Sequence, residues 1–397
     1  MSDRTDDRRL LAGHLALFVA LYAGYGALSP FLPLFLERRG LPAHEIAWLL
    51  ALAILARMVT GPLAGWIADR WGIVRPVLAG AAALAGLAAF GHLAVTGFAN
   101  LLAVGLAYAV LTAPLAPFSD ALALAASQNG RRFVYGWVRG VGSAAFILAT
   151  SVVGWLVPGL GIEAAILIGG GLFVAAGLAA NGLGTGRPPE VAARPRPRRG
   201  VSEVLANRRF RRVVLAASLV MGAHAMHDAF AMILWSRNSI PAGIAGLLWS
   251  EAVAAEILVF LLAGPWLLRR LDPGRAIGLA AVAGALRWGI SAETVALPAL
   301  VAIQCLHGLT FALLHLACLK EIGRCVPPDL TATALTLYGP LGLGLSSALF
   351  TLASGPLFAA YGASGFWGMS GVSLVALPVA IGLGRGERSR SGERVRT

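Results

Sequence analysis

The sequence predicts an all-α membrane protein in which twelve helices form two bundles of six. Hydrophobic residues make up 58% of the 397 residues, and they gather into twelve long apolar stretches. About 20 apolar residues of helix cross the roughly 30 Å hydrocarbon layer of a bilayer, and each stretch approaches or exceeds that length. When the chain is threaded through a bilayer as alternating hairpins, nearly all Lys and Arg residues fall on one side. These observations are typical of a polytopic helical membrane protein.

One long polar break, residues 184–209, divides the spans into two sets of six. It contains the run GRPPEVAARPRPRRG, and proline- and arginine-rich segments without apolar periodicity are typical of linkers. We therefore expect an N-terminal bundle over residues 1–183, a basic linker over 184–209, and a C-terminal bundle with a basic tail over 210–397. The first six spans are expected at 10–36, 44–68, 75–95, 98–125, 135–158 and 162–182, and the second six at 210–235, 242–268, 275–291, 296–322, 330–355 and 363–383.

The distribution of positive charge predicts the orientation. Cytoplasmic loops of membrane proteins retain Lys and Arg, whereas exported loops are depleted of them. With the N-terminus inside, 26 of the 32 Lys and Arg residues fall on the cytoplasmic side. We therefore expect both termini in the cytoplasm and a multi-pass protein of the inner membrane. The first apolar stretch is too long for a signal-peptide core, so we expect it to remain in the mature protein.

The composition also excludes several classes of function. The net charge of +13 is spread over the inner rim, where it attracts anionic lipid, and the basic loops lack the aromatic residues of a nucleic-acid surface. His224 with His227, and His315 with Cys318, offer only two metal ligands each, whereas zinc needs three or four. No nucleophile–base pair is visible. We therefore expect a non-enzymatic membrane protein without nucleic acid, metal or cofactor. We also expect a monomer.

A short basic loop follows the second span. The sequence GWIADRWG carries Gly65, Asp69, Arg70 and Gly72, and a related basic turn, GPWLLRRLDPGR, follows the eighth span. The spacing of these residues resembles the loop signature of the major facilitator superfamily, although an incidental basic turn is the alternative interpretation. This resemblance implies two six-helix bundles related by a pseudo-two-fold axis along the membrane normal, as in duplicated transporters.

Further segments resemble one branch of that superfamily. YGWVRGVGS, GAHA, LRWGI, LHG and HLA occur in the order found in the phenylpropionate permeases, which are relatives of the oligosaccharide and nucleoside proton symporters. The resemblance spans the whole chain and implies a proton-coupled carrier of a small organic molecule. The chain departs from the family pattern at His227 and Asp228, where tyrosines are common, and at Glu251, where an apolar residue is usual. These differences predict a more acidic cavity.

Five ionisable residues of the C-terminal half are expected near the middle of the membrane. Such groups are costly in the bilayer and therefore mark functional sites by default. His224 and Asp228 are four residues apart and would share a helix face, and Glu256 opposite Arg287 would form an ion pair that proton uptake dissolves. Its structural alternative is a static link between two helices. With His307, this set resembles the proton-handling residues of lactose-type symporters, and we expect it to couple proton movement to transport.

The N-terminal half offers candidates for substrate binding. Asp120 and Arg139 are predicted at similar depth, and Arg139 could hold a carboxylate, although a structural Asp120–Arg139 pair is the alternative. Arg57 lies in the middle of a span and is either a further anion site or a link between helices. Aromatic residues that could contact a substrate ring, or simply pack in the core, are Tyr22, Tyr25, Phe118, Phe230 and Phe311.

These observations favour a twelve-helix carrier that imports a small organic solute with protons, with a cavity lined mainly by the first, fourth, seventh and tenth spans. The expected substrate is an anionic aromatic acid similar to phenylpropionate. A sugar or nucleoside symporter is one alternative. A drug/proton antiporter is another, although the fifth span matches the antiporter glycine–proline motif poorly. A membrane sensor or lipid-handling protein remains as a third alternative.

Overall fold

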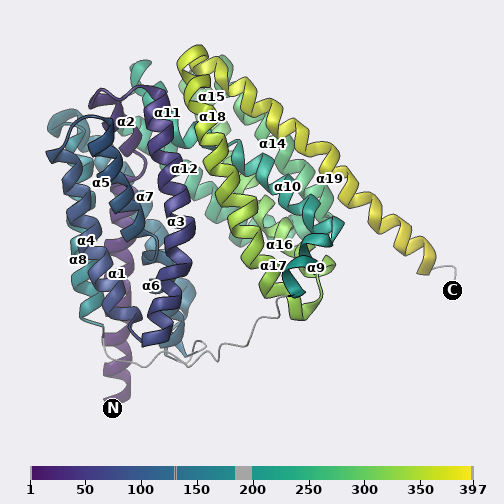
Figure 1. Ribbon diagram of the computed structural model, residues 1–397, viewed down its shortest axis with the longest axis horizontal. Helices are drawn as coiled ribbons and strands as arrows, with labels where there is room; N and C mark the ends of the chain where they lie inside the picture. The colour runs from purple at the N-terminus through teal and green to yellow at the C-terminus, as the bar shows by residue number, and fades with distance from the viewer. Residues whose placement is uncertain (1, 129, 131, 184–198, 395–397) are drawn as a thin grey trace. The chain divides into compact units, whose positions relative to one another are not determined.

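The structure is a computed structural model that describes the chain except residues 1, 129, 131, 184–198 and 395–397 (Figure 1). Most of the expected linker, residues 184–209, therefore lies outside the described residues. All secondary structure in the described part is helical, as the sequence predicts. The chain divides into two compact units, one of Met1–Ala193 with Trp235–Ser250 and one of Arg194–Leu234 with Glu251–Thr397.

The first unit is built mainly from eight helical segments that precede the linker. Two of them, α4 and α8, pack along each other, and a β-carbon on Gly177 of α8 would lie only 2.8 Å from the Ala79 carbonyl oxygen of α4. Small residues of this kind allow the backbones of membrane helices to approach closely. The segments are α1 (Ser2–Leu28), α2 (Leu32–Arg38), α3 (Ala43–Trp71), α4 (Val74–Ala94), α5 (Phe98–Thr112), α6 (Leu115–Ser127), α7 (Tyr135–Leu160) and α8 (Glu163–Asn181).

The segments after the linker are shorter and more often interrupted. The first group is α9 (Arg199–Ala206), α10 (Arg208–Gly222), α11 (Ala225–Arg237), α12 (Ala242–Leu258), η1 (Val259–Ala263), α13 (Gly264–Arg270) and α14 (Pro273–Glu293). The second group is α15 (Leu297–Cys305), η2 (Leu309–Leu313), α16 (Leu314–Cys325), η3 (Pro328–Leu330), α17 (Thr331–Leu337), η4 (Tyr338–Leu345), α18 (Ser346–Tyr361), η5 (Gly362–Gly365) and α19 (Phe366–Arg394). The core of the second unit is built from apolar residues of α10, α14, α16 and α19, among others.

Ten helical stretches of the described chain are long and apolar enough to cross a membrane. Nine of them match single predicted spans, and the tenth, Pro328–Leu383, contains two, because η5 separates α18 from α19. The remaining predicted span is α14, whose mean hydropathy is lowered by Arg275 and Arg287. The helices therefore account for the twelve passes that the sequence predicts.

Four of the described spans are interrupted between helical segments, namely those that contain the α1–α2, α5–α6, α10–α11 and α15–η2 breaks. Pro30 lies in the break between α1 and α2, and Pro114 lies in the break between α5 and α6, because proline lacks the backbone donor that a helix needs. The break between α10 and α11 contains no proline. There the backbone N–H of His224 donates to the Met221 carbonyl at 3.1 Å, which leaves the Val220 carbonyl available to a side chain.

Three segments of the described second unit are π-helical, namely η1, η2 and η4. Single π-helical turns are rare and occur frequently at functional sites. The segment η1 begins three residues after Glu256, and η2 begins two residues after His307. The regular helix geometry is therefore interrupted beside two of the predicted site residues.

Candidate functional site

The five predicted proton-coupling residues lie in the second unit on separate helical segments. His224 stands in the α10–α11 break, Asp228 in the first turn of α11, Glu256 in α12, Arg287 in α14, and His307 between α15 and η2. The side chains of four of them form one cluster, linked by a hydrogen bond between Arg287 and His307, a 3.6 Å contact between His307 and Glu256, and a ring contact between His224 and His307.

Arg287 is the most deeply buried charge of this cluster, with no exposed surface. Its Nη1 lies 2.8 Å from His307 Nδ1, and its Nη2 donates to Gln304 Oε1 at 2.8 Å. The guanidinium also lies over the ring of Trp288, 4.5 Å from the ring centroid. No carboxylate of the described chain lies within ion-pair distance of Arg287. Its buried charge is therefore held by neutral side chains that accept hydrogen bonds from both Nη atoms, while Nε is buried without a hydrogen-bond partner among the described residues.

The contact with Arg287 determines the tautomer of His307. A guanidinium can only donate hydrogen bonds, so Nδ1 of His307 must accept and cannot carry a proton. The neutral ring then carries its proton on Nε2, which lies 3.6 Å from Glu256 Oε2. The result is a directed chain in which Arg287 donates toward His307 and His307 points its N–H toward Glu256.

This arrangement corrects the predicted geometry. The sequence predicts a direct ion pair between Glu256 and Arg287, whereas the structure places the His307 ring between the two charges. The reason is the packing of η2, which begins two residues after His307 and contacts both α14, which holds Arg287, and η1, which begins three residues after Glu256. The carboxylate and the guanidinium are thus connected through an imidazole.

His224 forms a second branch of the cluster. Its Nδ1 lies 2.9 Å from the Val220 carbonyl that the helix break leaves available, and its Nε2 lies 2.9 Å from Thr310 Oγ1. The His224 ring makes edge contacts with Trp288 and His307, with centroids 5.2 and 5.3 Å apart. Because its Nδ1 bonds the Val220 carbonyl, the imidazole does not hydrogen-bond Asp228, although the spacing of four residues predicts that they act together.

The carboxylate of Asp228 instead contacts the adjacent residue, His227. Asp228 Oδ1 lies 3.3 Å from His227 Nδ1, and His227 Nε2 lies 3.4 Å from the side-chain nitrogen of Gln304. Gln304 in turn accepts from Arg287. Asp228, whose side chain is 61% exposed, is therefore connected to the buried arginine through His227 and Gln304.

In the first unit, Asp120 and Arg139 have separate partners. The hydroxyl of Tyr135 donates to Asp120 Oδ1 at 2.8 Å, and the Arg139 guanidinium lies over the ring of Tyr22, 4.4 Å from the centroid. Within the described residues, no carboxylate is in ion-pair contact with Arg139. Its planar donor groups are therefore not occupied by an internal acid.

Arg57 lies near a second group of hydroxyls. Its Nε donates to Thr112 Oγ1 at 3.5 Å, and the Tyr25 hydroxyl donates to the Thr112 carbonyl at 3.1 Å. The rings of Tyr22 and Tyr25 are 6.2 Å apart. The two predicted arginines of this unit thus lie beside tyrosines that are themselves neighbours.

The three predicted phenylalanines have different surroundings. Phe230 is fully buried and stacks on Phe358 at 4.6 Å, which is the environment of a core residue. Phe118 is also buried, at 7% exposure. Phe311, in η2, stacks on the His307 ring at 5.5 Å. Of the three, only Phe311 contacts the polar cluster.

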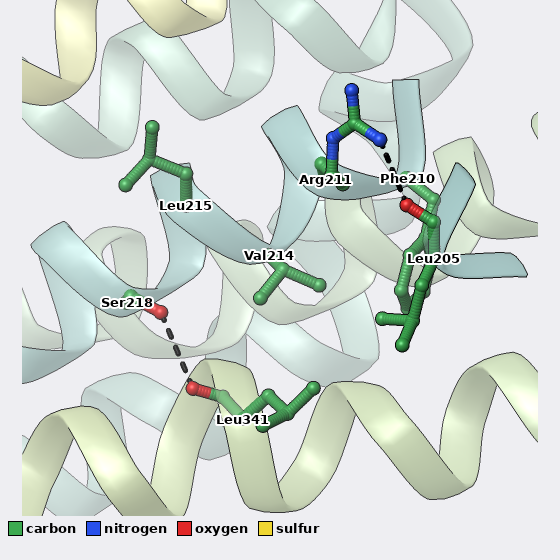
Figure 2. Close-up of a pocket in the computed structure, with 7 residues that line it drawn as sticks. All are labelled: Leu205, Phe210, Arg211, Val214, Leu215, Ser218 and Leu341. Atoms are coloured by element: carbon green, nitrogen blue, oxygen red, sulfur yellow. Dashed lines mark hydrogen bonds between the residues drawn. The ribbon is translucent and has the colours of Figure 1, made fainter. Parts of the chain in front are cut away.

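A pocket of about 270 Å³ lies elsewhere in the second unit, between α9, α10 and η4 (Figure 2). Its lining is mostly apolar. The one charged lining residue, Arg211, donates a hydrogen bond to the backbone carbonyl of Leu205 at 2.9 Å. None of the predicted site residues lines it. The lining residues are Leu205, Phe210, Arg211, Val214, Leu215, Ser218 and Leu341.

Comparison with known sequences decides the family. Residues 12–369 match the family described as "MFS_1 like family", which is most of the chain. The chain belongs to the MFS_1-like family. It is accordingly a multi-pass secondary transporter of the major facilitator superfamily and not an enzyme.

Several relatives of this MFS_1-like chain are named for small organic cargo. A protein of Escherichia coli (strain K12) named "Probable 3-phenylpropionic acid transporter" is 32% identical over 94% of this chain and 95% of its own length. The "Maltose permease" of Geobacillus stearothermophilus is 29% identical over 86% of each chain. The crystal structure of nucleoside transporter NupG shares the fold, with a TM-score of 0.83 at 18% identity, over 94% of this chain and 98% of that one.

The predicted loop motif is helical in this MFS_1-like chain: Gly65, Asp69 and Arg70 lie in the last two turns of α3, and Gly72 ends the helix. Gly72 follows the last residue of α3 with φ of +64°, a left-handed conformation that favours glycine, and its N–H bonds the Ala68 carbonyl. Arg70 lies over the Trp66 ring at 5.6 Å, and Asp69 is exposed. Gly65 has open space where a β-carbon would stand.

Three neutral residues of the cluster were not singled out from the sequence, namely Gln304, Thr310 and Trp288. Gln304 and Thr310 lie three residues before and after His307, and Trp288 follows Arg287 directly. A buried charge needs hydrogen-bonding neighbours, and positions three residues away share a helix face. This spacing is the signal that could have identified Gln304 and Thr310.

Proposed function

We propose that this MFS_1-like transporter takes up a small organic anion together with protons, by alternating access. The proposed cargo is an aromatic carboxylic acid of the phenylpropionate type, in keeping with the name of the 32% identical relative. In this proposal the protein works as a monomer in the inner membrane with both termini in the cytoplasm, as the distribution of Lys and Arg predicts.

The observation that carries the proposal is the chain of contacts from Arg287 through His307 to Glu256. With Glu256 ionised and His307 neutral, the charges of these three side chains sum to zero. Uptake of one proton changes the sum to +1, because the positive charge of Arg287 is then no longer balanced by Glu256. A positive charge in a medium of low dielectric constant favours the arrival of an anion. Proton uptake would therefore promote the binding of a carboxylate.

The hydrogen bonds favour Glu256 as the place where the proton resides. If His307 were protonated on both nitrogens, its Nδ1–H would face an N–H of Arg287, which also donates and is also positive. A proton on the Glu256 carboxylate avoids this conflict. His307 then acts as the neutral group that transmits the charge state of Glu256 to Arg287.

The anion itself is assigned to Arg139 in the first unit. A guanidinium presents parallel N–H donors that match the two oxygens of a carboxylate, and no carboxylate of the described chain occupies them. Tyr22 lies directly beside this group and offers an aromatic surface for a ring. Arg57, near Tyr25, offers a second guanidinium that could bind a carboxylate.

The experiment that tests the proposal is uptake into proteoliposomes of purified protein. Radiolabelled 3-phenylpropionate should accumulate when the interior is made more alkaline than the exterior, and accumulation should collapse when a protonophore abolishes the gradient. Uptake that ignores the imposed gradient would contradict proton coupling.

A neutral polyhydroxylated cargo is the second candidate, because a maltose permease and a nucleoside transporter are among the similar proteins. The Asp120–Tyr135 pair would then accept and donate hydrogen bonds to hydroxyl groups. A thermal-shift screen at two pH values separates the candidates, since a ligand at a given concentration stabilises the folded protein more the more tightly it binds. Stabilisation by maltose or nucleosides alone would favour the second candidate, and stabilisation by cationic dyes alone would favour an antiporter. A protein that none of these compounds stabilises would favour a sensor or lipid-handling role.

A further inference from the structure

The helix that carries His307 crosses the helix that carries Glu256 at a glycine. A β-carbon built on Gly308 would lie 2.5 Å from the Ala255 carbonyl oxygen, 2.6 Å from Val259 Cγ2 and 3.0 Å from the Ala255 carbonyl carbon. Two of these three atoms belong to backbone, which cannot rotate away as a side chain can. The crossing therefore has room for glycine and for no larger residue.

The residues at this crossing are the chain neighbours of the proposed proton-coupling pair. Gly308 follows His307 directly, and Ala255 precedes Glu256 directly. A π-helical turn begins within three residues of each of the paired side chains, Glu256 and His307, and these two turns, η1 and η2, contact each other. The closest approach of the two backbones thus coincides with the place where the imidazole and the carboxylate face each other.

The distance between the two side chains leaves little tolerance. His307 Nε2 and Glu256 Oε2 are 3.6 Å apart, already slightly longer than an ordinary hydrogen bond. Increasing the Gly308 contact from 2.5 Å to an ordinary 3.4 Å requires a displacement of about 0.9 Å. A displacement of that size along the line between the helices would lengthen the pair to roughly 4.5 Å, which separates the imidazole from the carboxylate and weakens their electrostatic interaction.

We propose that Gly308 is a positioning residue, which sets the separation of His307 and Glu256 and thereby permits proton coupling. This inference rests on the proposed proton-coupled uptake and adds a residue that carries no charge and has no side chain. Its role is to let the two π-helical segments approach until the carboxylate reaches the imidazole.

The test compares Gly308→Ala with Gly323→Ala in reconstituted protein. Gly323 lies on α16, further along the same span, and a β-carbon there meets nothing within 4 Å, so it controls for the substitution itself. Two quantities are measured for labelled 3-phenylpropionate: accumulation driven by a pH gradient, as a function of pH, and exchange against unlabelled substrate without a gradient. Exchange requires the carrier to bind and reorient but requires no net movement of protons.

Gradient-driven accumulation by the Gly308→Ala protein should be roughly tenfold to a hundredfold lower than that of wild type. A misplacement of about 1 Å at a reacting pair can lower a rate by about 10²-fold. Accumulation by this variant should also lose its pH dependence, while exchange remains close to that of wild type. Gly323→Ala should behave as wild type in both assays. A Gly308→Ala protein with normal accumulation and a normal pH profile would overturn the inference. So would a parallel loss of accumulation and exchange with an unchanged pH profile, because that pattern indicates a purely structural role.

Two further outcomes are distinguishable. If wild-type accumulation ignores the pH gradient while exchange proceeds, the proposed proton coupling fails, and the inference fails with it. If Gly308→Ala does not fold, Val259→Ile takes its place in both assays, because it enlarges the η1 side of the same crossing by one methylene-sized group. Val259→Ile should then reduce accumulation more than exchange, and equal effects on both would overturn the inference.

Discussion

Arg287 Nη1 lies 2.8 Å from His307 Nδ1, and this hydrogen bond makes the histidine an acceptor on the side of the arginine. The other ring nitrogen must then carry the proton and point it toward Glu256, 3.6 Å away. A direct Arg287–Glu256 pair would bind the two charges to each other. The intervening imidazole instead leaves the carboxylate, whose side chain is 25% exposed, able to exchange a proton while the arginine stays buried.

The first prediction concerns Arg287→Lys. A lysine keeps the positive charge but cannot form the two forked bonds to His307 Nδ1 and Gln304 Oε1, so one buried acceptor loses its partner. An unsatisfied buried group costs about 1–3 kcal/mol, and we expect the variant to be less stable by about 2 kcal/mol. A lower apparent melting temperature in detergent would report this loss.

The matched control for this variant is Arg275→Lys, on the same helix α14. Arg275 pairs with Asp272 but its side chain is 63% exposed, so its replacement should change stability little. If both variants melted at the wild-type temperature, the bonds of Arg287 would not hold the second unit together as the geometry indicates.

The second prediction concerns Glu256→Gln. The amide cannot bind or release a proton in the physiological range, so the charge sum of the cluster becomes fixed. We expect accumulation driven by an inside-alkaline gradient to be lost, and substrate exchange to persist with no dependence on pH. Flux of labelled substrate into proteoliposomes measures both quantities.

Glu293→Gln provides the comparison for Glu256→Gln. Glu293 is an exposed acid at the end of α14 that accepts a hydrogen bond from Trp367, at 2.8 Å. Its replacement should leave the pH gradient as effective as in wild type. Gradient-driven accumulation in the Glu256→Gln protein would show that another group carries the proton.

The predicted spans were accurate because hydropathy is a local property of the sequence. The side-chain contacts were harder to predict because they depend on where a helix departs from regular geometry. Counting along ideal helices places Glu256 opposite Arg287. The π-helical turns η1 and η2 change the helical register beside Glu256 and His307. The amino-acid composition of these turns does not predict a π-helix. His224 and Asp228, predicted to share a helix face, do not hydrogen-bond each other, since the α10–α11 break leaves the Val220 carbonyl to the His224 ring.

The third prediction concerns Arg139→Lys in the first unit. A lysine offers a point charge in place of the planar fork that fits a carboxylate. Hydrogen bonds to charged groups contribute about 1.5–3 kcal/mol each, so the loss of one should weaken binding by roughly tenfold to a hundredfold. Titration of the purified protein with 3-phenylpropionate, followed by thermal stabilisation, measures the change in affinity.

Arg132→Lys is the control for Arg139→Lys. Arg132 precedes the same helix, pairs with Asp7 at 3.3 Å and keeps 38% of its side chain exposed. We expect the affinity of this variant to equal that of wild type. An Arg139→Lys protein with unchanged affinity for the acid would place the anion elsewhere, and Arg57 would be the next residue to test.

The fourth prediction separates structural from functional charges. Glu321, at 1% exposure, receives two bonds of 2.8 Å from Arg209, which also donates to the Leu383 carbonyl at 3.1 Å. Removing one partner of a buried ion pair costs about 3–5 kcal/mol because the other charge remains buried. Since the Arg209 side chain is 24% exposed, we expect Arg209→Ala to lose about 3 kcal/mol, at the lower end of that range.

Combining substitutions at Arg209 and Glu321 tests whether the buried carboxylate causes this loss of stability. Adding Glu321→Gln to Arg209→Ala removes the buried carboxylate charge with which Arg209 pairs and should recover part of the stability. Arg208→Ala, at the exposed neighbouring position, should change little. The folded fraction of every variant should keep a wild-type pH profile of uptake, because this pair lies apart from the contacts of His307. A flattened pH profile in Arg209→Ala would instead make Glu321 part of the proton-coupling machinery.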